Sequence, residues 1–230
     1  MVEPLLKRLD TYDYDMLIAH SKLTEIKKGA YIYTEKTPSN YLYFIHQGNI
    51  RILKEIGDGK EITIFSRWKD DIFGEMGVFS GETYSTTAKA QKNSFIYYIS
   101  KGKLNALLAQ NGRMSLQFTK WVATSLESSN AKMRDYVAFG SEGAIASVFI
   151  RYSNMYGIVT TEGICITEPV RITDISKQIG ISRETVSRVV KKWKQKGIIK
   201  NDNKYFLIKD MHYFRKLLGC QYCGVTNCVI

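Results

Sequence analysis

Between Ile26 and Ile99 the chain consists of apolar runs of three to five residues, separated by turn residues such as glycine and asparagine. Runs of this length and spacing are typical of strands in a small antiparallel barrel or sandwich. The stretch from Gly74 to Gly81 interrupts the rhythm. The expected strands are Tyr31–Tyr33, Tyr41–Ile45, Ile50–Leu53, Ile62–Phe65 and Ile96–Ile99.

The apolar spacing changes between Leu104 and Phe139, where intervals of three and four residues or their sum indicate one face of a long helix. Its middle, Ser125–Asn130, is mostly polar, so the stripe is better suited to packing on a partner than to standing alone. A second copy of the chain is the simplest partner, and packing on the chain's own barrel is the alternative that periodicity leaves open. The stripe consists of Phe118, Val122, Leu126, Met133 and Val137.

Length and charge suggest two domains with different roles. The chain has 230 residues, with 33 Lys and Arg against 22 Asp and Glu, and a formal net charge of +11. At roughly 100–200 residues per domain, this length allows one or two domains, and we expect two. Residues 141–230 hold 14 of the basic and 7 of the acidic residues, so the smaller part carries most of the charge. Such asymmetry favours binding to nucleic acid or to another anionic surface.

The sequence lacks the marks of a membrane protein, a secreted protein or an enzyme. No apolar run approaches the ~20 residues of a membrane span, and residues 1–10 lack the apolar core of a secretory signal. A cytoplasmic protein is therefore expected. The absence of a glycine-rich phosphate loop and of a His-Glu-x-x-His motif argues against an enzyme.

Residues 173–190 contain two helix signatures joined by a turn. Thr173 or Asp174 is expected to cap the first helix, Gly180 permits the turn, and the Ser182 hydroxyl can cap the second helix. This arrangement is typical of a helix-turn-helix motif. The following runs 197–199 and 205–208 predict a hairpin, which makes the domain a winged helix-turn-helix.

The second helix has an apolar inner face and an outward face suited to DNA. Arginine can donate twice to guanine, and glutamate can accept from cytosine, at the end of the helix that enters the major groove. Lys191 and Lys192 continue the helix and are better placed for the phosphate backbone. The inner residues are Ile181, Val186 and Val190. The expected DNA-reading set is Ser182, Arg183, Glu184, Ser187 and Arg188.

The run Ser-Arg-Glu-Thr-Val-Ser-Arg at 182–188, behind a strand-rich domain and a long helix, resembles the CRP/FNR family of bacterial transcription regulators. The cassette Gly-Glu-Met-Gly-Val-Phe at 74–79 matches the family's barrel pattern. The resemblance implies a homodimer that binds double-stranded DNA at a two-fold symmetric site with TGTGA-type half-sites and works with RNA polymerase. It implies an α+β fold: a cyclic-nucleotide-binding-like β-barrel (jelly roll) at 1–108, a dimerisation helix at 109–139, a winged helix-turn-helix domain at 140–218 and a cysteine-rich tail at 219–230.

The family's phosphate clamp is missing from this chain. In members that bind cyclic nucleotides, the cassette continues to an Arg-Ser pair that holds the phosphate. Here the corresponding run is 82–87, Glu-Thr-Tyr-Ser-Thr-Thr, and no arginine occurs between Arg67 and Arg113. Tyrosine and threonine do not replace a bidentate, charge-assisted arginine contact. The sequence therefore argues against cyclic AMP as the signal.

Three of the four cysteines, Cys220, Cys223 and Cys228, form a Cys-x2-Cys-x4-Cys tail. In a reducing compartment such crowding favours metal binding or redox sensing over disulfides. Three thiolates leave one ligand of a zinc or iron–sulfur centre to come from elsewhere. Cys165 is a poor candidate, because it lies between two isoleucines and is expected to be a buried free thiol.

The cysteine tail resembles that of the FNR regulators of Bacillus, which implies one [4Fe–4S] cluster per chain with Asp135 as its fourth ligand. Without that resemblance, Asp135 would be interpreted as a solvated helix acid paired with Lys132 or Arg134. The implied function is an oxygen-responsive regulator of anaerobic genes whose DNA binding depends on the cluster. The alternative is a zinc-stapled regulator of the same family that senses a small effector in its barrel.

Overall fold

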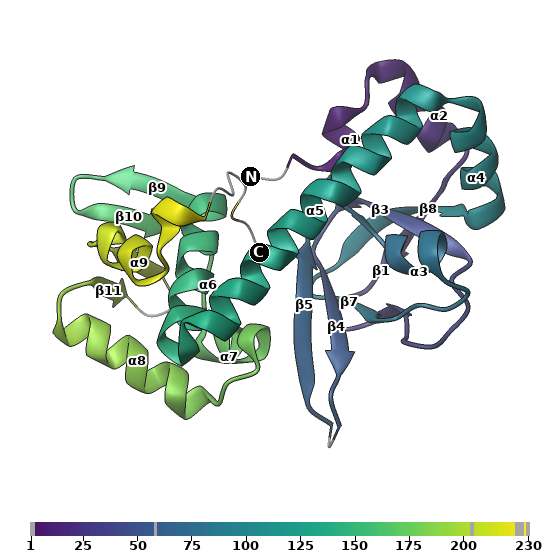
Figure 1. Cartoon of the computed structure of the whole chain (residues 1–230). Coiled ribbons are helices and arrows are strands. Elements are labelled where there is room, and N and C mark those ends of the chain that lie inside the picture. Colours follow the sequence, from purple (N-terminus) through teal and green to yellow (C-terminus); the bar gives the residue numbers. More distant parts are fainter. Residues whose placement is uncertain (1–2, 58, 203–204, 224–227, 229–230) are drawn as a thin grey trace. The chain divides into compact units, whose positions relative to one another are not determined.

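The computed structural model describes residues 3–57, 59–202, 205–223 and 228. The chain forms two compact units, Glu3–Ala123 and Thr124–Ile230, which we call the first and second units (Figure 1). The boundary lies within helix α5 (Gly112–Ala138). Among the described residues, no helix combines the length and the apolar character that crossing a membrane requires.

The first unit contains two four-stranded antiparallel sheets, with strand orders β1-β8-β3-β6 and β2-β7-β4-β5. All five predicted strands are present. The structure contains three further strands that the apolar pattern does not indicate. β6 has only two residues, β7 is built from small residues, and β1 has mixed polarity at the edge of its sheet. The strands are β1 (Lys22–Ile26), β2 (Tyr31–Tyr33), β3 (Tyr41–Gln47), β4 (Ile50–Glu55), β5 (Glu61–Arg67), β6 (Ile72–Phe73), β7 (Thr87–Ala90) and β8 (Ser94–Ser100).

Short helices accompany this barrel. The stretch that breaks the strand rhythm is helix α3 (Glu75–Ser80), which starts after Gly74 in a left-handed conformation with a φ of +86°. The other helices of the barrel are α1 (Leu5–Arg8), α2 (Thr11–Ala19) and α4 (Lys101–Gln110).

The single helix predicted from Leu104 to Phe139 is wrong in one respect: it is two helices, α4 and α5, separated at Asn111. The Asn111 side chain accepts a hydrogen bond from the Met114 N–H at 3.0 Å and donates one to Asp13 Oδ1 at 2.6 Å. Arg113 also donates to both oxygens of Asp13, at 3.1 and 3.2 Å. Asp13 is only 1% exposed, so this cluster fastens the start of α5 to α2.

The second unit is built around helix α6 (Gly140–Tyr156), much of which is buried, as expected of a helix that is covered by neighbours on several sides. Its aromatic core includes Phe149, whose ring lies 5.9 Å from Trp193 and 5.0 Å from Phe206. The remaining elements are β9 (Gly157–Thr160), β10 (Gly163–Ile166), α7 (Ile172–Ile179), α8 (Arg183–Gln195), β11 (Ile199–Asp202), β12 (Tyr205–Ile208) and α9 (Met211–Leu217).

The small sheet of the second unit has the order β11-β12-β10-β9. The predicted hairpin is therefore present as β11 and β12, and the helix-turn-helix as α7 and α8. Cys165 lies in β10, opposite Leu207 and Ile158, and is partly buried. These features confirm the α+β architecture of β-barrel, long helix and winged helix-turn-helix.

Candidate DNA interface and cysteine site

The turn between α7 and α8 has the local geometry that the sequence predicts. Gly180 has a φ of +69°, in the left-handed region that favours glycine. Ser182 Oγ accepts a hydrogen bond from the Thr185 N–H at 3.2 Å and thereby caps α8. The expected cap of α7 is wrong, because the helix starts at Ile172 and neither Thr173 nor Asp174 precedes it.

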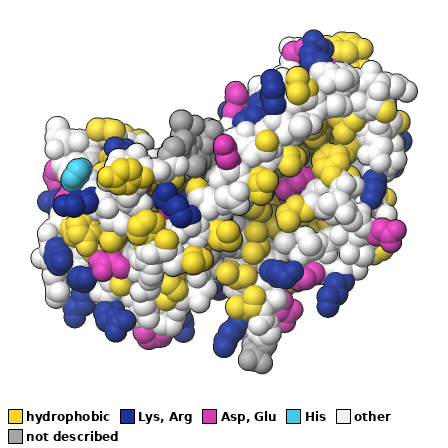
Figure 2. All heavy atoms as spheres, viewed as in Figure 1, with side chains coloured by type: hydrophobic (Ala, Val, Ile, Leu, Met, Phe, Trp, Pro, Cys, Tyr) yellow, Lys and Arg dark blue, Asp and Glu magenta, His cyan; other side chains and the backbone are white. Residues whose placement is uncertain are grey.

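Helix α8 buries one face and exposes the other. Val186 and Trp193 are fully buried in the core of the second unit. The side chains of Arg183, Glu184, Ser187 and Arg188 are exposed. Figure 2 shows Lys and Arg side chains gathered over α8, at the lower left of the view. The outward face therefore offers donors and acceptors of the kind that read base edges.

Glu184 is ionised at neutral pH. Hydrogen bonds from its own backbone N–H and from Ser182 lower the pKa of this exposed carboxyl group below its ordinary value. A carboxylate accepts hydrogen bonds only, so Glu184 can pair with the cytosine amino group but not with a base-edge acceptor.

A groove of about 450 Å³ runs between α8 and the β11–β12 hairpin. Three cationic side chains line it, and apolar residues including Val190 and Phe206 form part of its wall. Arg171, at the cap position of α7, was not singled out by sequence reasoning, because only the fold brings it beside α8. The cations are Arg171, Lys191 and Lys194. Such a cationic groove beside a recognition helix suits a phosphate backbone.

Lys192, which is expected to contact phosphate, has a partner within the chain. Its Nζ donates to Glu142 Oε2 at 3.0 Å, and Glu142 Oε1 accepts hydrogen bonds from Trp193 Nε1 and Tyr213 Oη, both at 2.9 Å. Burial opposes the ionisation of Glu142, but the three hydrogen bonds prevail and lower its pKa. Lys192 therefore joins α8 to α6, and its ammonium group is engaged within the chain.

Four of the five stripe residues on α5 are exposed. Their exposed fractions rise from 41% at Val122 to 78% at Val137. Phe118 is different: it is 3% exposed, and its ring lies 6.0 Å from that of Phe79 on the first unit's own α3. Phe118 therefore packs on the barrel and is not available to a partner. The exposed set is Val122, Leu126, Met133 and Val137, with Leu116 as a further member.

Asp135 is not a solvated helix acid, since it is 2% exposed. Its Oδ1 accepts two hydrogen bonds from Arg134, at 2.8 and 3.2 Å. Its Oδ2 accepts one from Ser147 Oγ at 2.7 Å and one from Arg151 Nη2 at 3.1 Å. Arg151 is itself fully buried, so the two buried charges neutralise each other.

The cysteine tail lies beside this buried carboxylate. Cys220 begins a 3-10 turn after α9, and Arg134 Nη2 donates to the Leu218 carbonyl at 3.1 Å. Farther along, Asn154 Nδ2 donates to the Cys228 carbonyl at 2.8 Å. The tail is thus fastened to both α5 and α6.

Asp135 and the neighbouring thiols influence the pKa of two of the three tail cysteines. Burial raises the pKa of the Cys220 thiol, and Asp135 and Cys223 raise it further. Burial also raises the pKa of the Cys228 thiol; Arg151 opposes this rise, while Asp135, Cys220 and Cys223 add to it. In the described part of the chain, no three His, Cys, Asp or Glu side chains are already arranged to hold a metal ion. The described positions of Cys220, Cys223, Cys228 and Asp135 are therefore not those of a metal site.

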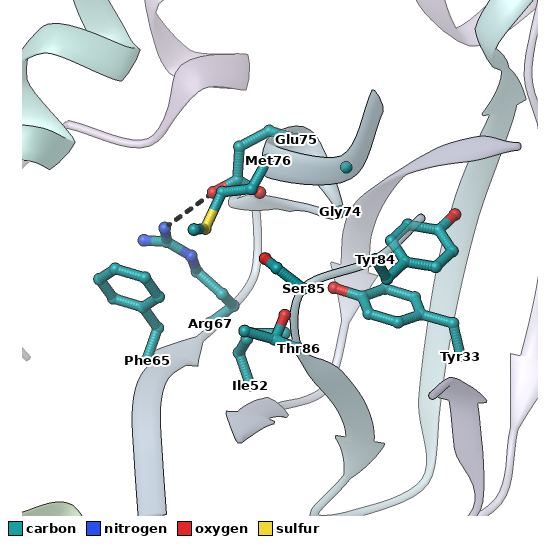
Figure 3. Close-up of a pocket in the computed structure, with 11 residues that line it drawn as sticks. Tyr33, Ile52, Phe65, Arg67, Gly74, Glu75, Met76, Tyr84, Ser85 and Thr86 are labelled. Atoms are coloured by element: carbon teal, nitrogen blue, oxygen red, sulfur yellow. Dashed lines mark ion pairs between the residues drawn. The ribbon is translucent and has the colours of Figure 1, made fainter. Parts of the chain in front are cut away.

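The barrel pocket is nearly filled by its own side chains (Figure 3). Its cavity volume is about 10 Å³, roughly the space for one water molecule. The rings of Tyr33 and Tyr84 stack with centroids 3.7 Å apart. Arg67 pairs with Glu75 at 3.6 Å and lies over the Phe65 ring at 4.5 Å. A ligand as large as a nucleotide would have to displace these groups.

Comparison with known protein families agrees with this architecture. Residues 23–111 match the model of the cyclic nucleotide-binding domain, and residues 144–217 match the model of the Crp-like helix-turn-helix domain. Among solved structures, a CooA mutant from Carboxydothermus hydrogenoformans has a TM-score of 0.81 at 20% identity, covering 94% of this chain and 96% of that one. At this identity, the similarity concerns the fold.

Among characterised relatives, the anaerobic regulatory protein of Bacillus subtilis (strain 168) is 33% identical to this chain over 219 residues. The match covers 94% of this chain and 92% of that protein. The CRP-like cAMP-activated global transcriptional regulator of Mycobacterium tuberculosis is 23% identical over 186 residues, covering 81% of this chain and 83% of that protein.

Proposed function

Since the chain belongs to the CRP/FNR family of DNA-binding transcription regulators, we propose that it is an oxygen-responsive regulator of anaerobic genes, controlled by a [4Fe–4S] cluster. The observation that carries this proposal is the attachment of the cysteine tail to α5 and α6, through Arg134 and Asn154, next to the buried Asp135 carboxylate. The likeness to the Bacillus subtilis anaerobic regulatory protein supports it independently.

The donor set fits an iron–sulfur cluster. Cys220, Cys223 and Cys228 would supply three thiolates and Asp135 the fourth ligand, and thiolates are the ligands that such clusters prefer. When bound, the cluster supplies an iron–sulfur centre that oxygen can attack. The carboxylate is a harder ligand than the thiolates, so the Asp135 bond is the weakest of the four.

DNA recognition is assigned to the exposed face of α8. Arg183, Glu184 and Arg188 read a TGTGA-type half-site, while Ser182 and Ser187 contact base edges or phosphates. Arg171, Lys191 and Lys194 bind the phosphate backbone in the groove beside α8. Two half-sites about 34 Å apart are bound by a dimer formed through the exposed apolar face of α5. RNA polymerase is the partner through which the bound dimer acts.

Asp135 and the tail cysteines, by holding one cluster between them, would fasten the tail to α5 and so control DNA binding. Arg134 and Asp135 lie on α5, whereas the cysteines follow α9, so a cluster held by both segments restrains the helix-turn-helix domain. Coupling of this kind is typically worth about 1–3 kcal/mol. Because the exposed face of α5 contains no cluster ligand, the dimer should persist when the cluster is lost.

Anaerobic purification tests the proposal directly. We expect brown protein with iron and sulfide each near four per chain. A colourless protein with one zinc ion per chain would support the zinc-stapled alternative and overturn the cluster. The pocket beside the 74–79 cassette has about 10 Å³ of free space, too little for a small effector without rearrangement of its side chains.

The cysteine variants test the control of DNA binding. Cys223→Ala should lose iron and bind a TGTGA-type site more weakly than the anaerobic holo-protein, while sedimentation still shows a dimer. Cys165→Ala is the matched control, because Cys165 lies in β10 and is not a proposed ligand. Titrations need a fixed salt concentration, since phosphate contacts make affinity steeply salt-dependent. A dimeric Cys223→Ala protein that binds DNA as tightly as the holo-protein would refute the coupling.

The base-reading role of α8 is tested at Arg183. Arg183→Val should lose about 1–3 kcal/mol of discrimination for the TGTGA-type site, with unchanged iron content. Unchanged preference would remove Arg183 from readout, and uniform loss at all sequences would make it a phosphate contact.

A further inference from the structure

The hydrogen-bonding capacity of the Asp135 carboxylate is fully used within the chain. Its two oxygens accept four hydrogen bonds, two from Arg134, one from Ser147 and one from Arg151. A carboxylate offers about four lone-pair positions. An iron ion can therefore bond to Asp135 only if one of these donors leaves.

The Ser147 hydroxyl is the weakest of the donors. Both guanidinium groups carry a positive charge, and hydrogen bonds between charged partners are roughly twice as strong as those of neutral donors. In addition, two N–H groups of Arg134 donate to the same oxygen, Oδ1 of Asp135. Ser147 Oγ, at 2.7 Å from Asp135 Oδ2, is neutral and holds one lone pair. Of the four hydrogen bonds to Asp135, the one from Ser147 therefore costs the least free energy to break.

Ser147 also has another acceptor within its own helix. It lies inside α6, where a serine hydroxyl can turn to the carbonyl of the residue four positions earlier, here Gly143. Because Ser147 is fully buried, its hydroxyl requires such a partner once it leaves Asp135. In the cluster-free chain, Ser147 Oγ also accepts a hydrogen bond from Arg151 Nε at 3.0 Å.

We propose that Ser147 competes with iron for Oδ2 of Asp135 and thereby sets how readily the fourth ligand is released. In the cluster-free chain the hydroxyl occupies the carboxylate, and in the loaded chain it bonds to its own helix. Ser147 is a positioning residue in this scheme, not a ligand. The inference rests on the cluster assigned under the proposed function.

The test compares Ser147→Ala with Ser153→Ala. Ser153 is a matched control, since it is also a buried serine of α6, but its hydroxyl donates to the Ile150 carbonyl at 2.8 Å and not to Asp135. The wild-type protein and both variants are loaded anaerobically and mixed with a ferrous-iron chelator under nitrogen. Loss of visible absorbance is then followed over time. Removing the competing hydroxyl should slow cluster loss roughly three- to tenfold in Ser147→Ala, while Ser153→Ala matches the wild type.

Thermal unfolding of the cluster-free proteins supplies a second readout. Competition predicts opposite effects in Ser147→Ala: a lower melting temperature without the cluster, and a longer cluster lifetime when loaded. Faster cluster loss together with a lower melting temperature would mean a purely structural role and would overturn the inference. Equal lifetimes in all three proteins would overturn it as well. A wild-type protein that never acquires iron and sulfide would overturn the proposed function and the inference together.

Discussion

Each unit of the chain buries an arginine against a carboxylate, but the two pairs have different neighbours. In the first unit, Arg67 pairs with Glu75 at 3.6 Å, beneath the rings of Phe65 and Trp121. In the second unit, Arg151 pairs with Asp135 at 3.1 Å, beside cysteine thiols. The first pair has aromatic rings and a further carboxyl group, Asp71, as neighbours, and the second has thiols that can bind a metal together with the carboxylate.

In the proposed function, the Arg67–Glu75 pair has only a structural role in the fold, whereas Asp135 can exchange a hydrogen-bond donor for a metal ion. The barrel keeps the shape of a ligand-binding domain, yet stacked tyrosines leave room for about one water molecule. The responsive chemistry of the proposed function lies in the second unit instead, which also contains the DNA-reading helix. Substitutions in the two regions should therefore have separable effects on stability and on iron content.

The largest effect is expected from Asp135→Ala. It removes the carboxylate that neutralises the buried Arg151, so the second unit of the cluster-free protein should lose about 3–5 kcal/mol of unfolding free energy. Iron content should fall as well, because a proposed ligand is lost. Urea unfolding followed by circular dichroism measures the first effect, and metal analysis the second. Asp174→Ala, at an exposed acid of α7, should change neither. A stable Asp135→Ala protein would show that Arg151 does not need this partner.

Tyr84→Ala should destabilise the first unit by about 3–5 kcal/mol, because it removes a buried ring from the stack with Tyr33. Iron content after anaerobic loading should stay at the wild-type value. Tyr84→Phe isolates the hydroxyl, which donates to the Tyr41 carbonyl at 2.7 Å, and should cost only about 1 kcal/mol. Loss of iron in a folded Tyr84→Ala protein would contradict the separation of the two regions.

Glu142 is a third carboxylate with partners inside the chain. It lies in the second unit, is only partly buried and is not a proposed metal ligand. Glu142→Gln should cost about 1–2 kcal/mol at pH 7, because three donors lose a charged acceptor. The lowered pKa of Glu142 means that its stabilising contribution is present above the ordinary value of 4.5 and is lost as the pH falls through the folded-state value. Melting temperatures of wild type and variant should therefore converge in acid. Glu162→Gln, at an exposed acid, is the control.

The smallest effect, with the opposite sign, is expected at Glu75. Burial raises the pKa of Glu75 although Arg67 opposes the shift, so ionisation of this group works against the fold above its ordinary value of 4.5. Glu75→Gln should leave stability at pH 7 unchanged or slightly higher, and the difference from wild type should vanish below about pH 4.5. Thermal melts across this range provide the measurement. A loss comparable to that of Asp135→Ala would mean that the two pairs are equivalent.

Features set by neighbouring residues could be predicted from the sequence. The Ser182 cap and the Gly180 turn depend on backbone groups a few positions away, and both are present as expected. The strands with apolar runs were predicted for the same reason. The cap of α7 was misplaced, because Thr173 and Asp174 have suitable side chains but already lie inside the helix.

Contacts between distant residues could not be predicted from the sequence. Periodicity put Phe118 in the apolar stripe, but only the fold shows that the barrel covers it. The ion pair of Lys192 with Glu142, fifty positions earlier, had no signal in the sequence. The buried partners of Asp135 on α6 gave no local signal either, since Ser147 and Arg151 are ordinary residues of a helix.

The ion pair between Asp13 and Arg113 affects when the first unit can fold during translation. The two residues are 100 positions apart, and synthesis at about 5–20 residues per second separates their appearance by about 5–20 s. Until Arg113 is delivered by the ribosome, Asp13 lacks the ion pair that holds it on α5. Once Arg113 has left the ribosome, the nascent first unit can close, before any residue of the cysteine tail has been translated.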